Sequence, residues 1–375
     1  MLKSKERGAS GSTVRAKGGK HLLARVLIVI AAVLVLVFSL VVAMFRTELK
    51  SLSTIRKIDD YPLYTMDYAA DYGLDEFLEQ GGASNDAELI DFVVGRLLKG
   101  LPIKIELPNL ACSTFNATAP DGDALFGRNF DLEFSPGMMV RTAPKDGYAS
   151  ISMVNLAFIG YGEDKLPEDL ASSVVTLAAP FAPLDGVNEK GLAVGVLLID
   201  TEATHQETDR VDITTTTAIR LMLDRCVTVE EAVDLLTRYD MHASGNRSYH
   251  FQIADASGES VVVEYIDNEM KLVEPGPEGY QAATNFLLTP GDYDFGGGQD
   301  RYETVMGRLA AAGGIMTEDE AMETLRSVSR EVKIKDNGEV FQTQWSVVYN
   351  LDDATATVCM GGKFDERHEL EVPTR

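Results

Sequence analysis

This chain of 375 residues is poor in cysteine, histidine and basic residues: it has three Cys, five His, and 34 Lys and Arg against 58 Asp and Glu. So few cysteines exclude a ladder of disulfides, and a domain of this size must rely on its hydrophobic core. The formal net charge of −24 argues against nucleic acid or an anionic surface as a partner. None of the histidines lies in a recognisable motif, and we expect no metal and no cofactor.

The three cysteines are Cys112, Cys226 and Cys359. Their number allows one Cys226–Cys359 bridge. However, Cys226 lies in a helix-like segment and Cys359 in a strand-like run, which favours two buried free thiols. Cys112 is then the odd thiol and the first candidate for chemistry.

One long hydrophobic run lies near the amino terminus. Residues 26–45 are twenty residues without a charge, and at about 1.5 Å per residue they span the roughly 30 Å hydrocarbon core of a bilayer. A cleaved signal peptide has an apolar core of only about 7–15 residues, so this length favours an uncleaved anchor in the cell membrane. Basic residues precede the run, which puts the amino terminus in the cytoplasm and the large domain outside the cell.

These features divide the chain into parts. Residues 46–111 begin as a polar stalk and continue with helical signals, among them a cap at Ser84, Asn85 and Asp86. Glycine and proline then precede residue 112, as in a spacer or a pro-segment before a cut. The predicted parts are a basic cytoplasmic tail (residues 1–25), a transmembrane helix (26–45), a stalk and helical pro-segment (46–111) and the main domain (112–375).

The main domain has the pattern of a layered protein. Apolar and β-branched runs predict strands, and periodic segments capped by Thr228 and Thr317 predict helices. Strands alternating with pairs of helices indicate an α/β (α+β) arrangement in which mostly antiparallel sheets are packed between helices. The predicted strands are residues 149–157, 173–177, 192–199, 249–255, 260–265, 271–273, 281–289, 344–351 and 354–360, and the predicted helices are residues 214–226, 229–239, 301–312 and 318–329.

Residues 112–134 are predicted to form a β-hairpin that carries reactive side chains. Asp-Gly at residues 121–122 is the preferred pair for a two-residue type I′ turn, which places Cys112 directly opposite Asp131. Arg128 lies three residues before Asp131, so only a bulge or a strong twist brings both side chains to Cys112. A cation beside the sulfur favours the thiolate, and an acid near the Cys112 nitrogen holds an amine there.

The spacing from Cys112 to Phe-Gly-Arg-Asn-Phe-Asp at residues 126–131 resembles the choloylglycine hydrolase or linear-amide C–N hydrolase family of N-terminal-nucleophile (Ntn) enzymes, with penicillin V acylase, bile salt hydrolase and acid ceramidase relatives. The resemblance implies an αββα sandwich and hydrolysis of a small-molecule N-acyl amide by Cys112. It also implies self-cleavage between Ala111 and Cys112, and the long segment before Cys112 is most similar to the self-processed precursor of the acid ceramidase branch. The freed α-amine, with a pKa near ~7.7–8, would be the base.

The resemblance assigns roles to four further residues. Asp131 would hold the amine of Cys112, and Arg128 would orient and stabilise the sulfur. Asn285, in a Thr-Asn pair, would donate to the oxyanion of the tetrahedral intermediate. Arg301 resembles the second arginine of the family, which lies near the nucleophile.

One position departs from the family pattern. Leu198 stands six residues after Leu192, where bile salt hydrolases carry a second oxyanion Asn. Either a backbone N–H replaces that donor or the substrate is not a conjugated bile salt. Outright loss of an oxyanion donor costs on the order of 10²–10³ in rate.

Three alternatives stay open. A Cys112/His250 dyad would replace the amine as base. An acyltransferase would use the same site with an amine as the acceptor of the acyl group. An anchored binding protein would keep the fold without catalysis. The sequence predicts neither the identity of the substrate nor the oligomeric state.

Overall fold

The computed structural model describes residues 17–100, 111–334 and 340–374. The chain divides into two compact units, Met1–Leu49 and Lys50–Arg375. Residues 1–16 of the predicted basic tail and residues 101–110 of the predicted pro-segment lie outside the described residues.

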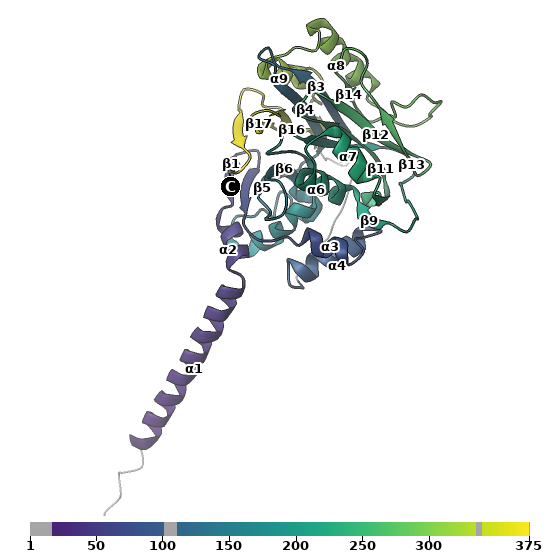
Figure 1. Cartoon of the computed structure of the whole chain (residues 1–375). Coiled ribbons are helices and arrows are strands. Elements are labelled where there is room, and N and C mark those ends of the chain that lie inside the picture. Colours follow the sequence, from purple (N-terminus) through teal and green to yellow (C-terminus); the bar gives the residue numbers. More distant parts are fainter. Residues whose placement is uncertain (1–16, 101–110, 335–339, 375) are drawn as a thin grey trace, which may run out of the picture. The chain divides into compact units, whose positions relative to one another are not determined.

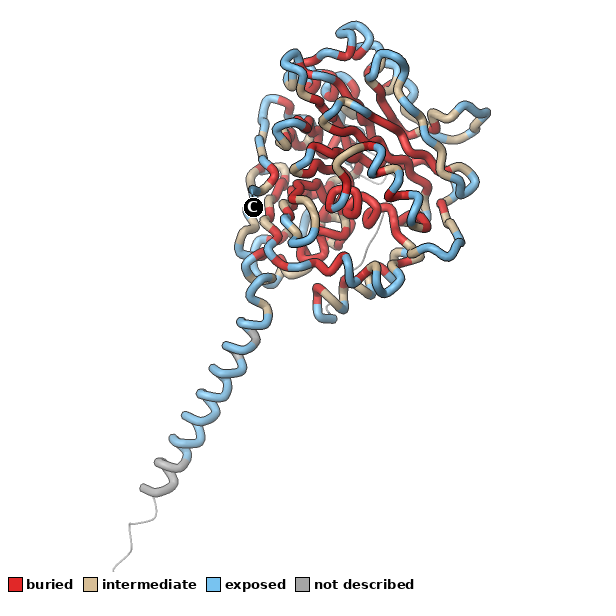
Figure 2. Tube along the Cα trace, viewed as in Figure 1, coloured by how far each residue is buried: buried red, intermediate tan, exposed pale blue. Residues whose placement is uncertain are grey.

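The first unit contains helix α1 (Lys17–Met44). Within the described residues, Leu23–Met44 is the one helical stretch long and apolar enough to cross a membrane, in agreement with the prediction for residues 26–45. Its described side chains are exposed (Figure 2). A membrane anchor and a signal sequence share these features, so anchoring and topology stay predictions.

The larger of two stacked sheets has, within the described residues, nine strands in the order β1-β2-β5-β6-β7-β8-β11-β12-β13. Neighbouring strands pair antiparallel except β2 and β5, which run parallel. The strands are β1 (Arg56–Asp59), β2 (Leu63–Tyr68), β5 (Gly137–Thr142), β6 (Ser150–Asn155), β7 (Pro183–Asn188), β8 (Ala193–Ile199), β11 (Ser248–Ala254), β12 (Ser260–Ile266) and β13 (Glu269–Val273).

The smaller sheet follows the order β14-β3-β4-β16-β17-β18, with β15 paired to β16, and its strands pair antiparallel. A separate parallel pair joins β9 (Val211–Thr214) and β10 (Tyr239–His242). The strands of the smaller sheet are β3 (Ala111–Thr118), β4 (Ala124–Glu133), β14 (Ala282–Ala283), β15 (Lys333–Ile334), β16 (Val340–Asn350), β17 (Thr355–Met360) and β18 (His368–Glu371).

Helices cover the outer faces of both sheets, which gives the predicted αββα order of layers (Figure 1). Helices α6 and α7 pack on the larger sheet, and α8 and α9 pack on β3, β4, β14 and β16 of the smaller one. Helix α2 (Arg46–Ser53) runs across the boundary between the two units. The helices of the second unit are α3 (Leu74–Glu79), α4 (Asp86–Arg96), α5 (Leu170–Ser173), α6 (Thr215–Arg225), α7 (Val229–Leu236), α8 (Gln299–Ala312) and α9 (Glu318–Ser327), with 3₁₀ segments at Leu156–Ile159, Val174–Phe181 and Ser244–Asn246.

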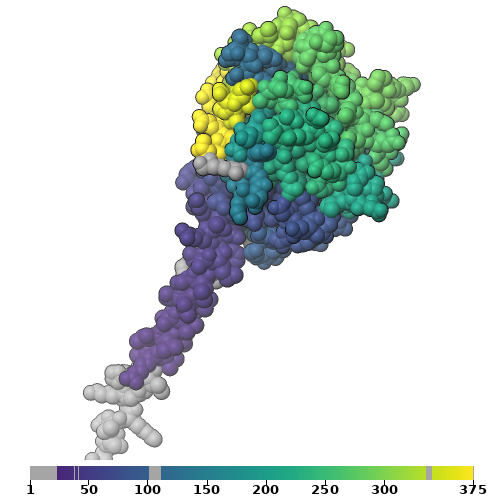
Figure 3. Space-filling view, in the orientation of Figure 1, coloured from purple at the N-terminus to yellow at the C-terminus, as the bar shows by residue number. Residues whose placement is uncertain are grey.

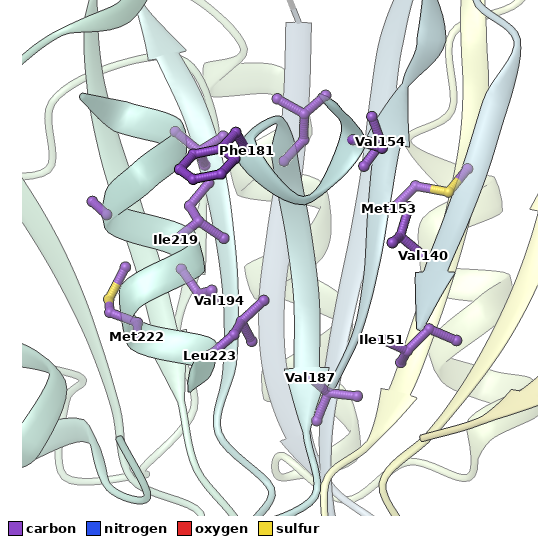
Figure 4. Close-up of a cluster of buried hydrophobic side chains, with 14 of the residues drawn as sticks. Val140, Ile151, Met153, Val154, Phe181, Val187, Val194, Ile219, Met222 and Leu223 are labelled. Atoms are coloured by element: carbon purple, nitrogen blue, oxygen red, sulfur yellow. The ribbon is translucent and has the colours of Figure 1, made fainter. Parts of the chain in front are cut away.

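An apolar core holds these layers together. Figure 4 shows Ile219 and Leu223 of α6 near Val187 and Val194 of β7 and β8. The central strands β6, β7, β8 and β11 are buried along their whole length (Figure 2), whereas the edge strands β1, β13 and β18 are largely exposed or half-buried. Because a central strand in this architecture is covered on both faces, β8 is an almost unbroken apolar run rather than an alternating one.

Residues before the hairpin also belong to the fold. Strands β1 and β2 join the larger sheet, and Leu63 and Met66 of β2 are fully buried. The sequence analysis missed both strands. It correctly predicted helical structure in α3 and α4, where the Asn85 side chain accepts from the Glu88 N–H and caps α4. The division at residue 112 therefore stays a proposal about processing.

Two predicted strands are wrong. Residues 173–177 lie in α5 and the 3₁₀ segment after it, because the Asp169 side chain caps this turn and starts a helix. Residues 281–289 form only the two-residue strand β14, and the chain beyond it turns away as a loop.

The turn between β3 and β4 differs from the predicted type I′ turn. Ala119 N donates to Asp123 O (2.7 Å), and Gly122 N donates to Ala119 O (3.0 Å). Gly122 has a φ of 108°, which side chains rarely adopt. The connection is therefore a three-residue loop with a glycine bulge instead of a two-residue loop.

This turn shifts the register of the hairpin by one residue, so the predicted pairing of Cys112 with Asp131 is wrong. Phe130 lies opposite Cys112, and Asp131 lies opposite Ala111. Paired residues share a face and successive residues alternate. Cys112 and Arg128 therefore lie on one face of the hairpin and Asp131 on the other, without the bulge in the hairpin strands that the sequence analysis required.

The last strand lies beside the first strand of this unit. His368 Nε2 on β18 is 2.6 Å from Asp59 Oδ2 on β1. Figure 3 shows the yellow residues of the carboxyl terminus near the violet residues of these first strands. This contact connects an edge of the smaller sheet to an edge of the larger one.

Candidate active site

Cys112 is fully buried in β3, on the hairpin face toward the larger sheet. Arg128 Nη2 on β4 lies 3.6 Å from Cys112 Sγ, so the predicted cation is beside the predicted nucleophile. Burial raises the pKa of the Cys112 thiol to about 11, although the charge of Arg128 opposes this rise. In the continuous chain the thiol is therefore protonated near neutral pH, and it needs a base to become a nucleophile.

A buried carboxylate fixes the position of Arg128. Its Nε lies 2.7 Å from Asp185 Oδ2 on β7, and its Nη1 donates to the carbonyl oxygen of Val196 on β8 (2.6 Å). Asp185 also accepts from the Tyr349 hydroxyl (2.5 Å) and the Trp345 indole N–H (3.3 Å). The larger sheet thus holds the guanidinium that faces a sulfur in the smaller sheet.

Asp131 lies on the opposite face of the hairpin, where Arg301 reaches it from α8. Arg301 Nη1 donates to Ser113 Oγ (2.7 Å) and to the carbonyl oxygen of Cys112, and it lies 3.6 Å from Asp131 Oδ2. Asp131 Oδ1 accepts from the Thr343 hydroxyl (2.6 Å). Burial raises the pKa of Asp131, and the charge of Arg301 opposes that rise. Within the described residues, Asp131 Oδ2 has no hydrogen-bond partner.

Asn285 connects the backbone of Cys112 to both sheets. Its Oδ1 accepts from the Cys112 N–H (2.7 Å) and from Arg301 Nη2 (2.7 Å). Its Nδ2 donates to the carbonyl oxygen of Leu198 on β8 (2.9 Å). An amide nitrogen carries two hydrogens, so the bond to Leu198 leaves one for a further acceptor.

The five predicted site residues thus come together from four places in the fold. Arg128 lies at the sulfur of Cys112, Asn285 and Arg301 lie at its backbone, and Asp131 lies one pair away across the hairpin. The group combines a thiol, two guanidinium groups, a carboxylate and an amide in a buried setting. Such a set can support a thiol nucleophile and a developing oxyanion.

His250 does not form the alternative dyad. Its Nδ1 lies 3.2 Å from Glu264 Oε1, and its Nε2 lies 2.6 Å from the carbonyl oxygen of Thr284. Both ring nitrogens therefore have partners other than Cys112, and neither is left to accept the thiol proton.

The other two cysteines, Cys226 and Cys359, are free and buried, which confirms the predicted thiols and argues against a bridge. In the part of the chain that the structure describes, no group of three or more His, Cys, Asp or Glu side chains could hold a metal ion.

The sequence analysis missed Asp185, Thr343 and Ser113. Asp185 carried a usable signal, because a carboxylate inside an otherwise apolar strand must find a buried partner. Thr343 and Ser113 carried none, since hydroxyl residues are common in strands and only the register brings these two to Asp131 and Arg301.

Part of this chain is similar to a known protein family. Residues 112–282 match the family model described as linear amide C-N hydrolases, choloylglycine hydrolase family. This stretch of the chain is therefore similar to that family. The match begins at Cys112, the residue beside Arg128.

Penicillin V acylase of Pectobacterium atrosepticum is 34% identical over 112 residues, which cover 27% of this chain and 29% of that protein. The similar stretch thus spans less than a third of the length of that relative. Two variants of the conjugated bile acid hydrolase of Clostridium perfringens are each 16% identical, cover 69% of this chain and 92% of theirs, and have TM-scores of 0.51 and 0.50. These structures confirm the predicted mixed α/β fold of Ntn type.

Proposed function

We propose that this protein hydrolyses linear, non-peptide amides through a thioester on Cys112. The observation that carries the proposal is the convergence of Arg128, Asn285 and Arg301 on one buried cysteine. The similarity of residues 112–282 to the family model supports the same reaction class, because that family is described as linear amide C-N hydrolases. The start of the family match at Cys112 supports a nucleophile at a new amino terminus.

The first step of the proposal is a cut before Cys112. The sulfur attacks the Ala111 carbonyl carbon, the Ala111–Cys112 amide bond breaks as a thioester forms, and the freed α-amine takes the thiol proton. Water then hydrolyses the thioester. The cut would create an amine on Cys112, next to Ala111, the residue opposite Asp131. Among the described residues Asp131 Oδ2 has no hydrogen-bond partner and lies 3.6 Å from Arg301 Nη1.

Turnover then uses the same atoms. The α-amine, with a pKa near ~7.7–8, accepts the thiol proton, and the sulfur attacks the amide carbonyl of the substrate. The free hydrogen of Asn285 Nδ2 stabilises the oxyanion. The leaving amine takes a proton from the ammonium group, and water releases the acid from the thioester.

The proposed substrate is a small-molecule N-acyl amide with an apolar acyl part, by analogy with the family. Leu198 contributes only its carbonyl oxygen to Asn285, so the side-chain donor that bile salt hydrolases carry at this position is absent. This difference favours an acyl amide other than a conjugated bile salt.

The proposed location is the cell membrane, with residues 26–45 as a single anchor, the amino terminus in the cytoplasm and the amidase domain outside. The support is the uncharged length of the segment and the basic residues before it.

The test combines mass measurement with turnover. We expect the purified full-length chain to yield a fragment that begins at Cys112 and to hydrolyse members of a panel of fluorogenic N-acyl coumarin amides. Cys112→Ala should abolish both the cut and turnover, a loss on the order of 10⁶ in kcat for a nucleophile, and Cys112→Ser should retain at most a slow cut. The matched controls Cys226→Ala and Cys359→Ala also remove a buried thiol and should keep both.

Two outcomes would replace the proposal. An uncut wild-type chain without thiol-dependent turnover would indicate an anchored binding protein. Faster loss of substrate with added amines, and new N-acyl products, would indicate an acyltransferase on the same cysteine.

A further inference from the structure

His250 and Glu264 form a buried pair behind the candidate site. They lie next to each other on β11 and β12, both with fully buried side chains. His250 Nε2 is 2.6 Å from the carbonyl oxygen of Thr284, the residue before Asn285. A carbonyl oxygen can only accept, so Nε2 must carry a hydrogen.

Glu264 holds the chain on the other side of Asn285. Its Oε1 accepts from the Leu288 N–H (2.7 Å), and its Oε2 accepts from the Thr289 N–H (3.0 Å). Burial acts to raise the pKa of Glu264, but the hydrogen bond and charge of His250 and the N–H donors outweigh it and lower the pKa. The same Oε1 lies 3.2 Å from His250 Nδ1, so Glu264 contacts both the imidazole and the chain beyond Asn285.

The segment 284–289 has little regular structure of its own to hold Asn285. It follows the two-residue strand β14, and Asn285 pairs with Gly297 only as an isolated bridge. The His250–Glu264 pair contacts this segment at Thr284 and again at residues 288–289. These contacts link the loop to the larger sheet.

We propose that His250 and Glu264 are positioning residues that set the place of the Asn285 amide, and so of its oxyanion hydrogen, through the Thr284 carbonyl and the two N–H groups. This inference rests on the proposed function, and it assigns His250 a role other than general base. A misplacement of about 1 Å in such a group lowers the rate by up to ~10²-fold.

The test uses two substitutions that each keep one half of the imidazole. His250→Gln places an amide nitrogen near the former Nε2 and can still donate to Thr284. His250→Asn places it near the former Nδ1 and can still donate to Glu264. We expect kcat per cleaved chain to fall about tenfold to hundredfold in His250→Asn and by less than about fivefold in His250→Gln, with KM nearly unchanged in both.

Stability should follow the opposite order, which separates positioning from a merely structural role. His250→Gln leaves the Glu264 carboxylate without its side-chain partner and should unfold at the lower temperature of the two. The control His205→Gln changes a half-buried histidine outside this pair and should leave kcat within about twofold of wild type.

Three results are decisive. Equal losses of kcat in the two His250 variants, or a wild-type kcat in His250→Asn, would overturn the positioning role while leaving the amidase intact. A wild-type chain without thiol-dependent amidase activity would overturn the proposed function itself. If neither His250 variant folds, Glu264→Gln decides: a lower kcat at unchanged KM supports the inference, and an unchanged kcat overturns it.

Discussion

On one face of the β3–β4 hairpin the sulfur of Cys112 lies beside Arg128, and on the other face Arg301 holds the backbone of the same cysteine. The two arginines differ in what holds them. Arg128 is paired with Asp185 at 2.7 Å in the larger sheet, whereas Arg301 comes from α8 and lies 3.6 Å from Asp131.

Under the proposed function, this difference separates two tasks of Cys112. The sulfur would need a cation that favours the thiolate, and the amine freed by the proposed cut would need a carboxylate. Because side chains alternate along a strand, a hairpin can serve both needs from opposite faces. Substitutions that change only one face of the hairpin can therefore test whether the two faces have separate roles.

The largest expected effect is on the sulfur face. Asp185→Asn leaves the Arg128 guanidinium buried without its carboxylate, which typically costs about 3–5 kcal/mol in the free energy of unfolding. We also expect turnover per folded chain to fall, because Arg128 loses its fixed position at the sulfur. Chemical denaturation and kcat on the coumarin amides measure the two effects.

The chain offers a matched control for this substitution. Asp224 is also a buried carboxylate that pairs with an arginine, Arg220, at 2.7 Å and accepts from a tyrosine hydroxyl, that of Tyr72, at 2.5 Å. Asp224→Asn should lose similar stability but keep kcat per folded chain. An equal loss of kcat in the two variants would mean that the Arg128–Asp185 pair acts only through stability.

The second effect concerns the reactivity of the Cys112 thiol before and after the proposed cut. With a pKa of about 11, Cys112 in the uncut chain should react with iodoacetamide at least about a hundredfold more slowly near neutral pH than an ordinary thiol of pKa about 8.5. Its rate should rise as the pH approaches 11, since the thiolate is the reactive form. In the cut chain the nearby amine and the new opening should remove this delay.

Mass spectrometry of a partly cut sample can measure the labelling of Cys112 in the uncut and the cut chain in one experiment. Peptides that span residues 111–112 come from the uncut chain, and peptides that begin at Cys112 come from the cut chain. Burial also raises the pKa of Cys226 to about 12 and that of Cys359 to about 11. Both thiols should therefore be labelled slowly, and they serve as internal references for the labelling rate of Cys112. Fast labelling of Cys112 in the uncut form would contradict the role of burial.

The smallest expected effect is on the amine face, in the uncut Cys112→Ala chain. Burial raises the folded-state pKa of Asp131, so its stabilising contribution is fully present below its unfolded pKa and is lost as the pH rises through the folded value. The stability of Cys112→Ala relative to Cys112→Ala/Asp131→Asn should therefore be greatest at acidic pH and should decline toward neutral pH. Thermal unfolding across this range measures the difference, and a rise with pH would contradict it.

The proximity of Arg128 to Cys112 could be predicted from the sequence because both residues lie in one hairpin at short spacing. The pairing of Cys112 could not, since the register depends on whether the loop has two or three residues. That choice depends on a single glycine: the positive φ of Gly122 forms the bulge, and Asp-Gly suits both turns. One residue of register moves Asp131 from the sulfur of Cys112 to the opposite face.

Other features escaped prediction because their partners are far away in the chain. β2 pairs with β5, more than sixty residues later, and nothing in the polar context of residues 46–68 signals this pairing. Asn285 and Arg301 could be predicted only by resemblance, since a loop Asn and a helix-start Arg are common on protein surfaces. Their shared contact with Cys112 depends on how β14 and α8 pack.

The parallel pairing of β2 with β5 has a consequence for the product of the proposed cut. Six residues of β2, Leu63–Tyr68, are in register with Gly137–Thr142, and hydrogen bonds of a sheet do not depend on a peptide bond elsewhere in the chain. Scission before Cys112 would therefore yield a noncovalent heterodimer that travels as a single particle until a denaturant separates it. Since its shorter chain includes helix α1, that helix would remain attached to the amidase in every native fraction.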